Sequence, residues 1–145
     1  MGRERIDQSD YSIFIGDWET EGKILSTDGN PEMEIRGTDT YEVILDGFFI
    51  LHKADVMMGT EKSQTFELMW LEGSGEEVTL QYYNNAGESG VMQGALVNDI
   101  WKIDGKDLRF EGHFNNDHTQ LKGIWQRLTA DQRWGNFIEI RLSRK

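Results

Sequence analysis

Apolar and polar side chains alternate along most of this chain from residue 14 onward. In residues 17–24 the even positions include Trp18, Thr20 and Ile24, whereas every odd position carries a charge. A period of two is typical of a β-strand with one face in an interior and the other in water. About ten such segments follow one another, separated by turns rich in Gly, Asn and Asp. Because helical spacing is absent from nearly all of them, the pattern predicts an all-β chain.

The succession of hairpins also predicts how the sheet is closed. An open meander of amphipathic strands would leave two long unpaired edges, and closure into a barrel removes both. We therefore predict a single up-and-down antiparallel β-barrel of about ten strands over residues 14–145, preceded by a short arm or helical turn over residues 1–13. Because diameter grows with strand number beyond the eight that side chains can fill, such a barrel is expected to hold a cavity.

The residues expected to line this cavity are those that share an inward phase on their strands. They are His52, Asp39, Tyr41, Gln64, Phe66, Trp70, Tyr82, Gln93, Phe110, Trp125 and Arg127. Aromatic rings suit a pocket wall, although core packing alone would also explain them. His52 could hydrogen-bond a ligand or transfer protons, or be a satisfied interior histidine. Arg127 could bind a ligand carboxylate or be paired with Asp39.

Composition excludes several classes of function. The net charge of -11 argues against nucleic acid and anionic membrane surfaces, which select clusters of Lys and Arg. The chain has no cysteine and no long apolar run, so we expect a soluble cytoplasmic protein. No metal is expected, because no second inward histidine and no paired carboxylates are found near His52. The outward apolar residues Phe49, Leu51 and Met57 favour a subunit interface, as in a homodimer.

Short motifs add a family resemblance that covers most of the chain. The Gly16-Asp17-Trp18 step, continued to Gly22, resembles the opening of the calycin superfamily of lipocalins, fatty-acid-binding proteins and nitrobindin-like barrels. The layout is most similar to an uncharacterised bacterial lipocalin-like family, through the segments 37–41 and 45–49. The resemblance implies a small-molecule pocket at one barrel mouth and a basic side chain stacked over Trp18 as a structural plug. Arg141 and Arg127 are the candidates for that cation.

Haem does not follow from the resemblance. Nitrobindin-type proteins bind iron through a histidine near the C-terminus, and the corresponding strand here, residues 137–143, contains none. His52 lies too early in the chain to take that role, and His113 and His118 are assigned no function. We therefore expect no cofactor.

Three functions fit these observations. The leading hypothesis is a binding protein, rather than an enzyme, for a small, mostly apolar or amphipathic molecule with one anionic or hydrogen-bonding end. The second is a calycin-type isomerase, lyase or hydrolase that uses His52 or Asp39 as acid or base, with Tyr82 in support. The third is an interaction protein whose interior is packed solid.

Overall fold

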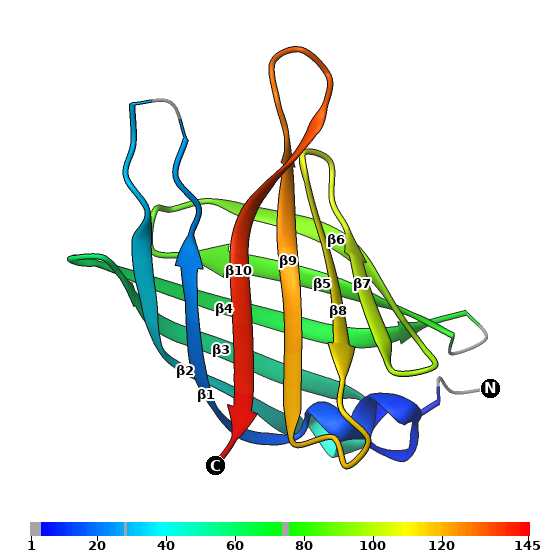
Figure 1. The fold of residues 1–145 in the computed structure, drawn as a ribbon. Coiled ribbons are helices and arrows are strands. Elements are labelled where there is room, and N and C mark those ends of the chain that lie inside the picture. The colour runs from blue at the N-terminus through cyan, green and yellow to red at the C-terminus, as the bar shows by residue number, and fades with distance from the viewer. Residues whose placement is uncertain (1–3, 28, 74–75) are drawn as a thin grey trace.

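The computed structural model, which describes residues 4–27, 29–73 and 76–145, is a closed barrel of ten antiparallel strands (Figure 1). The strands are β1 (Gly16–Ile24), β2 (Met33–Ile44), β3 (Phe49–Met58), β4 (Glu61–Glu72), β5 (Glu77–Asn84), β6 (Ser89–Val97), β7 (Ile100–Asp104), β8 (Leu108–Phe114), β9 (Gln120–Leu128) and β10 (Trp134–Arg144). Each strand pairs with its neighbours in the chain, and β1 pairs with β10 to close the sheet. The predicted all-β, up-and-down barrel is confirmed.

Short helices cover one mouth of the barrel. Two 3-10 helices, η1 (Ile6–Gln8) and η2 (Asp10–Phe14), lie across it, and a third, η3 (Leu45–Gly47), links β2 to β3 (Figure 1). The Tyr11 hydroxyl fastens η2 to the barrel: it donates to the carbonyl of Glu76 (2.7 Å) and accepts from the amide of Leu96 (3.1 Å). The predicted helical turn is thus present, while residues 1–3 of the expected arm lie outside the described part of the chain.

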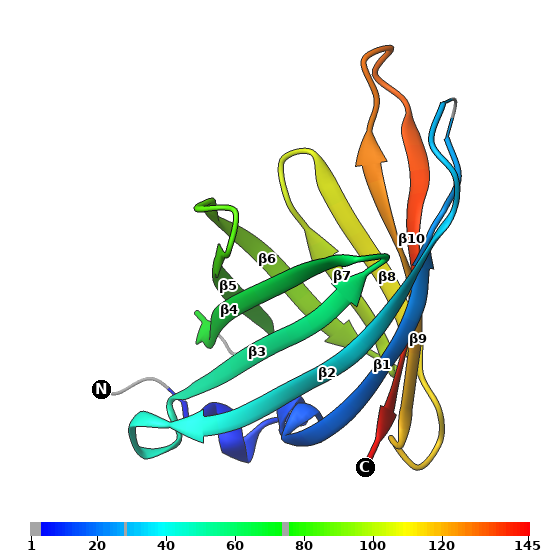
Figure 2. The same ribbon diagram turned by 90° about the vertical axis from the view of Figure 1, so that its left-hand side faces the viewer.

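The hydrophobic core fills the end of the barrel that these helices cover, which we call the closed end. Phe14 of η2 lies at its centre, with ring centroids 4.9 Å from Trp101, 5.2 Å from Tyr41 and 5.2 Å from Phe114. Inward residues toward the opposite, open end are less covered. Met58, Met92, Trp125, Ile138 and Ile140 all face inward there and are half-buried. The interior therefore has a packed floor and a less completely covered upper half, in which Ile35 and Val56 are nonetheless buried. Figure 2 shows the strands diverging away from the helices.

The Gly16–Trp18 motif anchors the closed end. Trp18 is 1% exposed and donates its indole N–H to the carbonyl of Phe14 (2.8 Å). The guanidinium of Arg144 stacks 4.2 Å from the Trp18 ring. Gly16 has φ +131°, and a Cβ there would lie 2.6 Å from Arg144 Nη1. The first glycine of the motif is therefore required both by its backbone conformation and by the arginine that it accommodates.

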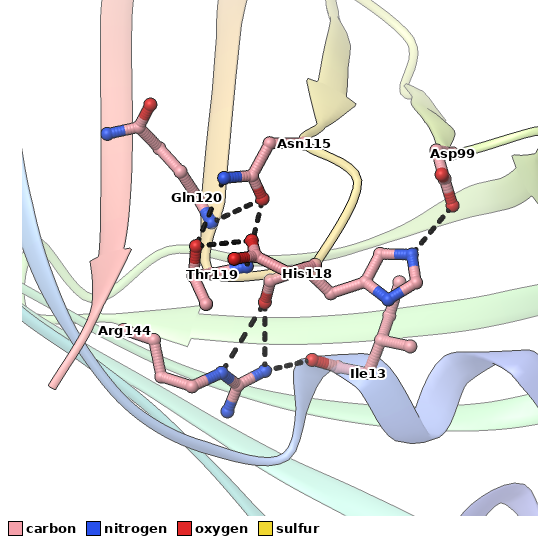
Figure 3. Close-up of polar contacts among 8 residues, drawn as sticks. Ile13, Asp99, Asn115, His118, Thr119, Gln120 and Arg144 are labelled. Carbon is pink, nitrogen blue, oxygen red and sulfur yellow. Dashed lines mark hydrogen bonds and ion pairs between the residues drawn. The ribbon is translucent and has the colours of Figure 1, made fainter.

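Arg144 also ties the surrounding loops to the closed end. It donates to the carbonyls of Ile13 (2.5 Å) and Ile15 (2.7 Å), and it lies within 3.4 Å of the carbonyl of His118 (Figure 3). His118 in turn bonds to Asp99 (2.9 Å), which joins the β8–β9 loop to the β6–β7 turn (Figure 3).

The prediction that Arg141 or Arg127 stacks over Trp18 was wrong. Arg141 faces outward and pairs with Glu21 (2.5 Å). Arg127 is exposed, with its guanidinium 4.4 Å from the ring of Phe137. The position opposite Trp18 on β10 belongs to Arg144. Arginines three residues apart lie on opposite faces of a strand, so the correct assignment depends on the register between the first and last strands.

The predicted inward phase was also wrong on two strands. On β4 the inward side chains include Thr65, Glu67 and Met69, and Phe66, predicted to line the cavity, is 42% exposed. On β6 the inward set contains Gly90 and Met92, so the odd-numbered residues of that strand face outward. Residues 68–71 are apolar without interruption, so alternation cannot decide their phase. Aromatic residues occupy the outer surface here, and a carboxylate occupies the interior.

Candidate functional site

A cluster of polar side chains is buried inside the barrel, directly above the packed floor. His52 Nε2 lies 2.6 Å from Asp39 Oδ2, and His52 Nδ1 lies 3.0 Å from Glu67 Oε1. The hydroxyl of Thr20 donates to the other oxygen of Asp39. Thr20, Asp39 and Glu67 are all buried, at 1%, 6% and 8% exposure. We call His52, Asp39, Glu67 and Thr20 the interior polar cluster.

Strand register brings these four residues together. His52 on β3 pairs with Glu67 on β4 and with Tyr41 on β2, and Asp39 is the next inward residue of β2. The ring of Tyr41 stacks beneath His52, with centroids 4.0 Å apart and planes 6° from parallel. Residues directly opposite on adjacent strands have neighbouring Cβ atoms, so the cluster is a direct product of the sheet.

Both ring nitrogens of His52 face a carboxylate, which fixes its charge. Burial by itself lowers the pKa of His52, because it disfavours the charged form. The hydrogen bonds to Asp39 and Glu67 and their negative charges outweigh burial and raise the pKa to about 10. His52 is therefore an imidazolium at neutral pH, donating one N–H to each carboxylate. Burial, with the same two charges, raises the pKa of Tyr41 well above its ordinary value.

The stability of the protein is expected to fall as pH rises from 6.5 toward 10. Because the folded pKa of His52, about 10, lies above its ordinary value of 6.5, its charged interactions stabilise the fold fully below pH 6.5 and are lost through pH 10. The free energy of unfolding should decrease by up to about 1.4 kcal/mol per pH unit in this window. Urea unfolding of the wild type and of His52→Leu at several pH values measures the difference, which isolates His52 from other groups. A difference that does not change with pH would contradict the assigned charge.

The cluster retains acceptor capacity and no free donor. The second oxygen of Glu67 receives no hydrogen bond from the described residues, yet it is not among the buried atoms left without a partner. It is therefore in contact with solvent in the upper interior. Asp39 and Glu67 lie at opposite edges of the imidazole ring, and the described residues contain no group of three or more His, Asp or Glu side chains able to hold a metal ion.

The structure brings six of the predicted lining residues to the interior. Asp39, Tyr41, His52, Tyr82, Phe110 and Trp125 face inward, and their contact with a ligand stays a prediction. Gln64, Phe66, Trp70 and Gln93 face outward, against the expectation. Trp70 donates to Glu72 (3.1 Å) on the outer face, and Gln93 accepts a long bond from Thr79 (3.5 Å) there. Arg127 does not meet Asp39, whose partners are Thr20 and His52.

Glu67 is the member of the interior polar cluster that was not predicted from the sequence. The signal was available in the turn between β3 and β4. Met58 and Glu61 pair across the two residues Gly59 and Thr60, and counting outward from that turn places His52 opposite Glu67. Gly59 has φ +63°, as a tight hairpin turn requires. Turn length would thus have fixed the register where alternation could not.

The outward apolar residues Phe49, Leu51 and Met57 are confirmed on the outer face of β3. They continue into an aromatic row on the neighbouring strands, where Phe66 and Tyr83 contact each other at 6.2 Å between centroids. The homodimer expected from these residues stays a prediction.

An open groove of about 1120 Å³ lies on the outer surface over β1, β2 and β7–β10. Most of its lining is charged, and much of that charge is paired within the groove, as in Arg141–Glu21 and Lys102–Glu111. A glycine allows the close strand contact behind it: a Cβ on Gly22 would lie 2.2 Å from the carbonyl oxygen of Glu139. We read this groove as a solvated outer face.

The fold and the interior polar cluster together define a ten-stranded antiparallel barrel with a charged histidine inside. The family described as "Protein of unknown function (DUF1579)" matches residues 12–131, and the chain belongs to this family. The crystal structure of Rv2717c from M. tuberculosis is similar, with a TM-score of 0.76, 12% identity and 99% of each chain covered, a likeness that concerns the fold. No curated protein matches. No helix among the described residues is long and apolar enough to cross a membrane.

Proposed function

We propose that this protein binds a small, mostly apolar molecule in the upper half of the barrel, above the interior polar cluster. The observation that carries the proposal is the incomplete burial of the inward apolar side chains there, notably Met58, Met92, Trp125 and Ile140. Apolar side chains that line a solvent-filled interior gain about 25 cal/mol for each Å² that a ligand covers. Pockets of small-molecule-binding proteins have this composition, mainly apolar walls with a few polar groups.

The geometry favours binding over acid–base catalysis. A general base must offer a free nitrogen to the proton that it takes up. Both nitrogens of His52 are bonded to carboxylates, and the pKa of about 10 keeps the ring protonated at neutral pH. The roles of His52 and Asp39 as acid and base therefore have little support, and we place both residues in the wall of the binding site.

The proposal is tested by filling the interior from one strand. Thr65 faces inward and is half-buried, whereas its neighbour Gln64 is exposed on the outer face. We expect the wild type to bind the uncharged dye Nile red saturably, and Thr65→Trp to weaken that binding by about tenfold or more, because the indole would occupy the ligand's volume. Gln64→Trp adds the same side chain to the outside and should leave the affinity unchanged.

Fluorescence titration with each variant, after urea unfolding has shown that both are folded, decides the result. If Thr65→Trp and Gln64→Trp lower the affinity for the dye equally, or if neither changes it, the dye binds outside the barrel. Failure of the wild type to bind Nile red or decan-1-ol would overturn the proposal itself.

A further inference from the structure

We propose that Glu67 makes the barrel interior selective for ligands whose polar end is an amine or another hydrogen-bond donor, and that it rejects carboxylates. This inference rests on the proposed function, since it names the chemistry of the molecule that the same interior takes. It runs against the expectation that Arg127 binds a ligand carboxylate.

The donors of the interior polar cluster are all in use. Each N–H of His52 points at a carboxylate oxygen, at 2.6 Å to Asp39 and 3.0 Å to Glu67. The hydroxyl of Thr20 is donated to Asp39. A ligand carboxylate arriving at the cluster would find no free hydrogen on His52 or Thr20 to accept, so these residues would not compensate for its lost hydration.

The acceptor that remains belongs to Glu67. Its second oxygen has no hydrogen bond from the described residues, although the residue is 8% exposed, and that oxygen reaches the solvent of the upper interior. One imidazolium between two carboxylates leaves a formal charge of −1 on the cluster. A buried carboxylate oxygen with an open lone pair is completed by a donor, and most strongly by a cation.

The surroundings of Glu67 suit an ammonium group as well. Tyr82 pairs with Glu67 from the adjacent strand β5, faces inward and is half-buried. Its ring extends over Gly90 of β6, where an added Cβ would lie 2.7 Å from the Tyr82 hydroxyl oxygen. Among the described residues, the ion pairs of Asp39 and Glu67 are both with His52, so neither carboxylate is neutralised by Lys or Arg. Arg127, the cation expected to meet a ligand carboxylate, is exposed beside Phe137.

Three probes of equal chain length separate the alternatives: decylamine, decan-1-ol and decanoate, each used to displace Nile red from the intact protein. We expect decylamine to bind at least about tenfold more tightly than decanoate, because a charge-assisted hydrogen bond stabilises one and repulsion opposes the other. In Glu67→Gln, which keeps an oxygen for His52 and removes a charge, the ratio should shrink to about threefold or less. Glu19→Gln makes the same change at an exposed position on the outer face and should keep the wild-type ratio.

Each result has a distinct meaning. A decanoate affinity equal to or above that of decylamine in the wild type, or a ratio that survives Glu67→Gln, would overturn this inference and leave the proposed function standing. If decan-1-ol and both charged probes fail to displace the dye, the proposed function falls and the inference with it. If Glu67→Gln does not fold, the ratio of decylamine to decanoate affinity is measured for the wild type at high salt. Salt screens the acidic outer surface and leaves a buried contact largely intact, so a preference set by Glu67 should persist and one set by the outer surface should be lost.

Discussion

Trp18→Ala should lower the free energy of unfolding by about 3–5 kcal/mol, the range for removing a large buried aromatic side chain. Trp18 is 1% exposed, bonds to the carbonyl of Phe14 and lies beneath the guanidinium of Arg144. Its removal would leave a void at the closed end and release the arginine that holds the 3-10 helices and the β8–β9 loop. Urea or thermal unfolding followed by circular dichroism measures the loss.

A matched control exists at the other end of the barrel. Trp134 also carries an arginine over its ring, with Arg109 at 4.2 Å, and it is half-buried. Trp134→Ala should therefore cost much less, about 1–2 kcal/mol, because little of the cavity term applies. Similar losses in the two variants would show that Trp18 is not the anchor of the closed end.

His52→Leu should be destabilising by about 3–5 kcal/mol at neutral pH, the usual effect of breaking a buried ion pair from one side. Leucine removes the donor that both Asp39 and Glu67 use, and it leaves the two carboxylates facing each other across an apolar side chain. The effect should shrink as pH rises toward 10, since the wild type then loses the same charge. Chemical unfolding of the wild type and the variant gives the difference.

His113→Leu is the control for this change. His113 is exposed on the outer face, and its imidazole lies 3.9 Å from Glu111. Surface substitutions of this kind usually stay within about 0.5 kcal/mol. Should His52→Leu prove as mild as His113→Leu, the two carboxylates would have to be neutral in the folded protein, and the charge assigned to the cluster would be wrong.

Much of the architecture could be predicted from the sequence because most strands have one polar and one apolar face. The charged odd positions of residues 17–23 leave no choice of phase, and β1 has the phase predicted for it. β4 and β6 lack this asymmetry: residues 68–71 of β4 are all apolar, and β6 offers Val91 and Met92 on opposite faces. Where both faces of a strand are apolar, hydrophobicity does not show which face points into the barrel.

Strand phase also explains why only part of the candidate site could be predicted. His52 and Asp39 lie on strands with clear phase and were placed in the interior. Glu67 was missed because the even-numbered residues of β4, Gln64, Phe66 and Trp70, were expected inside; the cost of burying its carboxylate is offset by the hydrogen bond to His52. Arg144 was missed because stacking on Trp18 depends on contacts between the two most distant strands, which local patterns do not encode.

The seam between β1 and β10 has a consequence for the order in which this molecule assembles. Every other pairing joins strands adjacent along the chain and can zip from its own hairpin, whereas the seam joins segments that start far apart. Loop-closure entropy makes that final docking the slow event. Until it occurs, β1 and β10 present unpaired edges, so the aggregation-prone species in refolding is an open sheet that can pair with other copies of the chain.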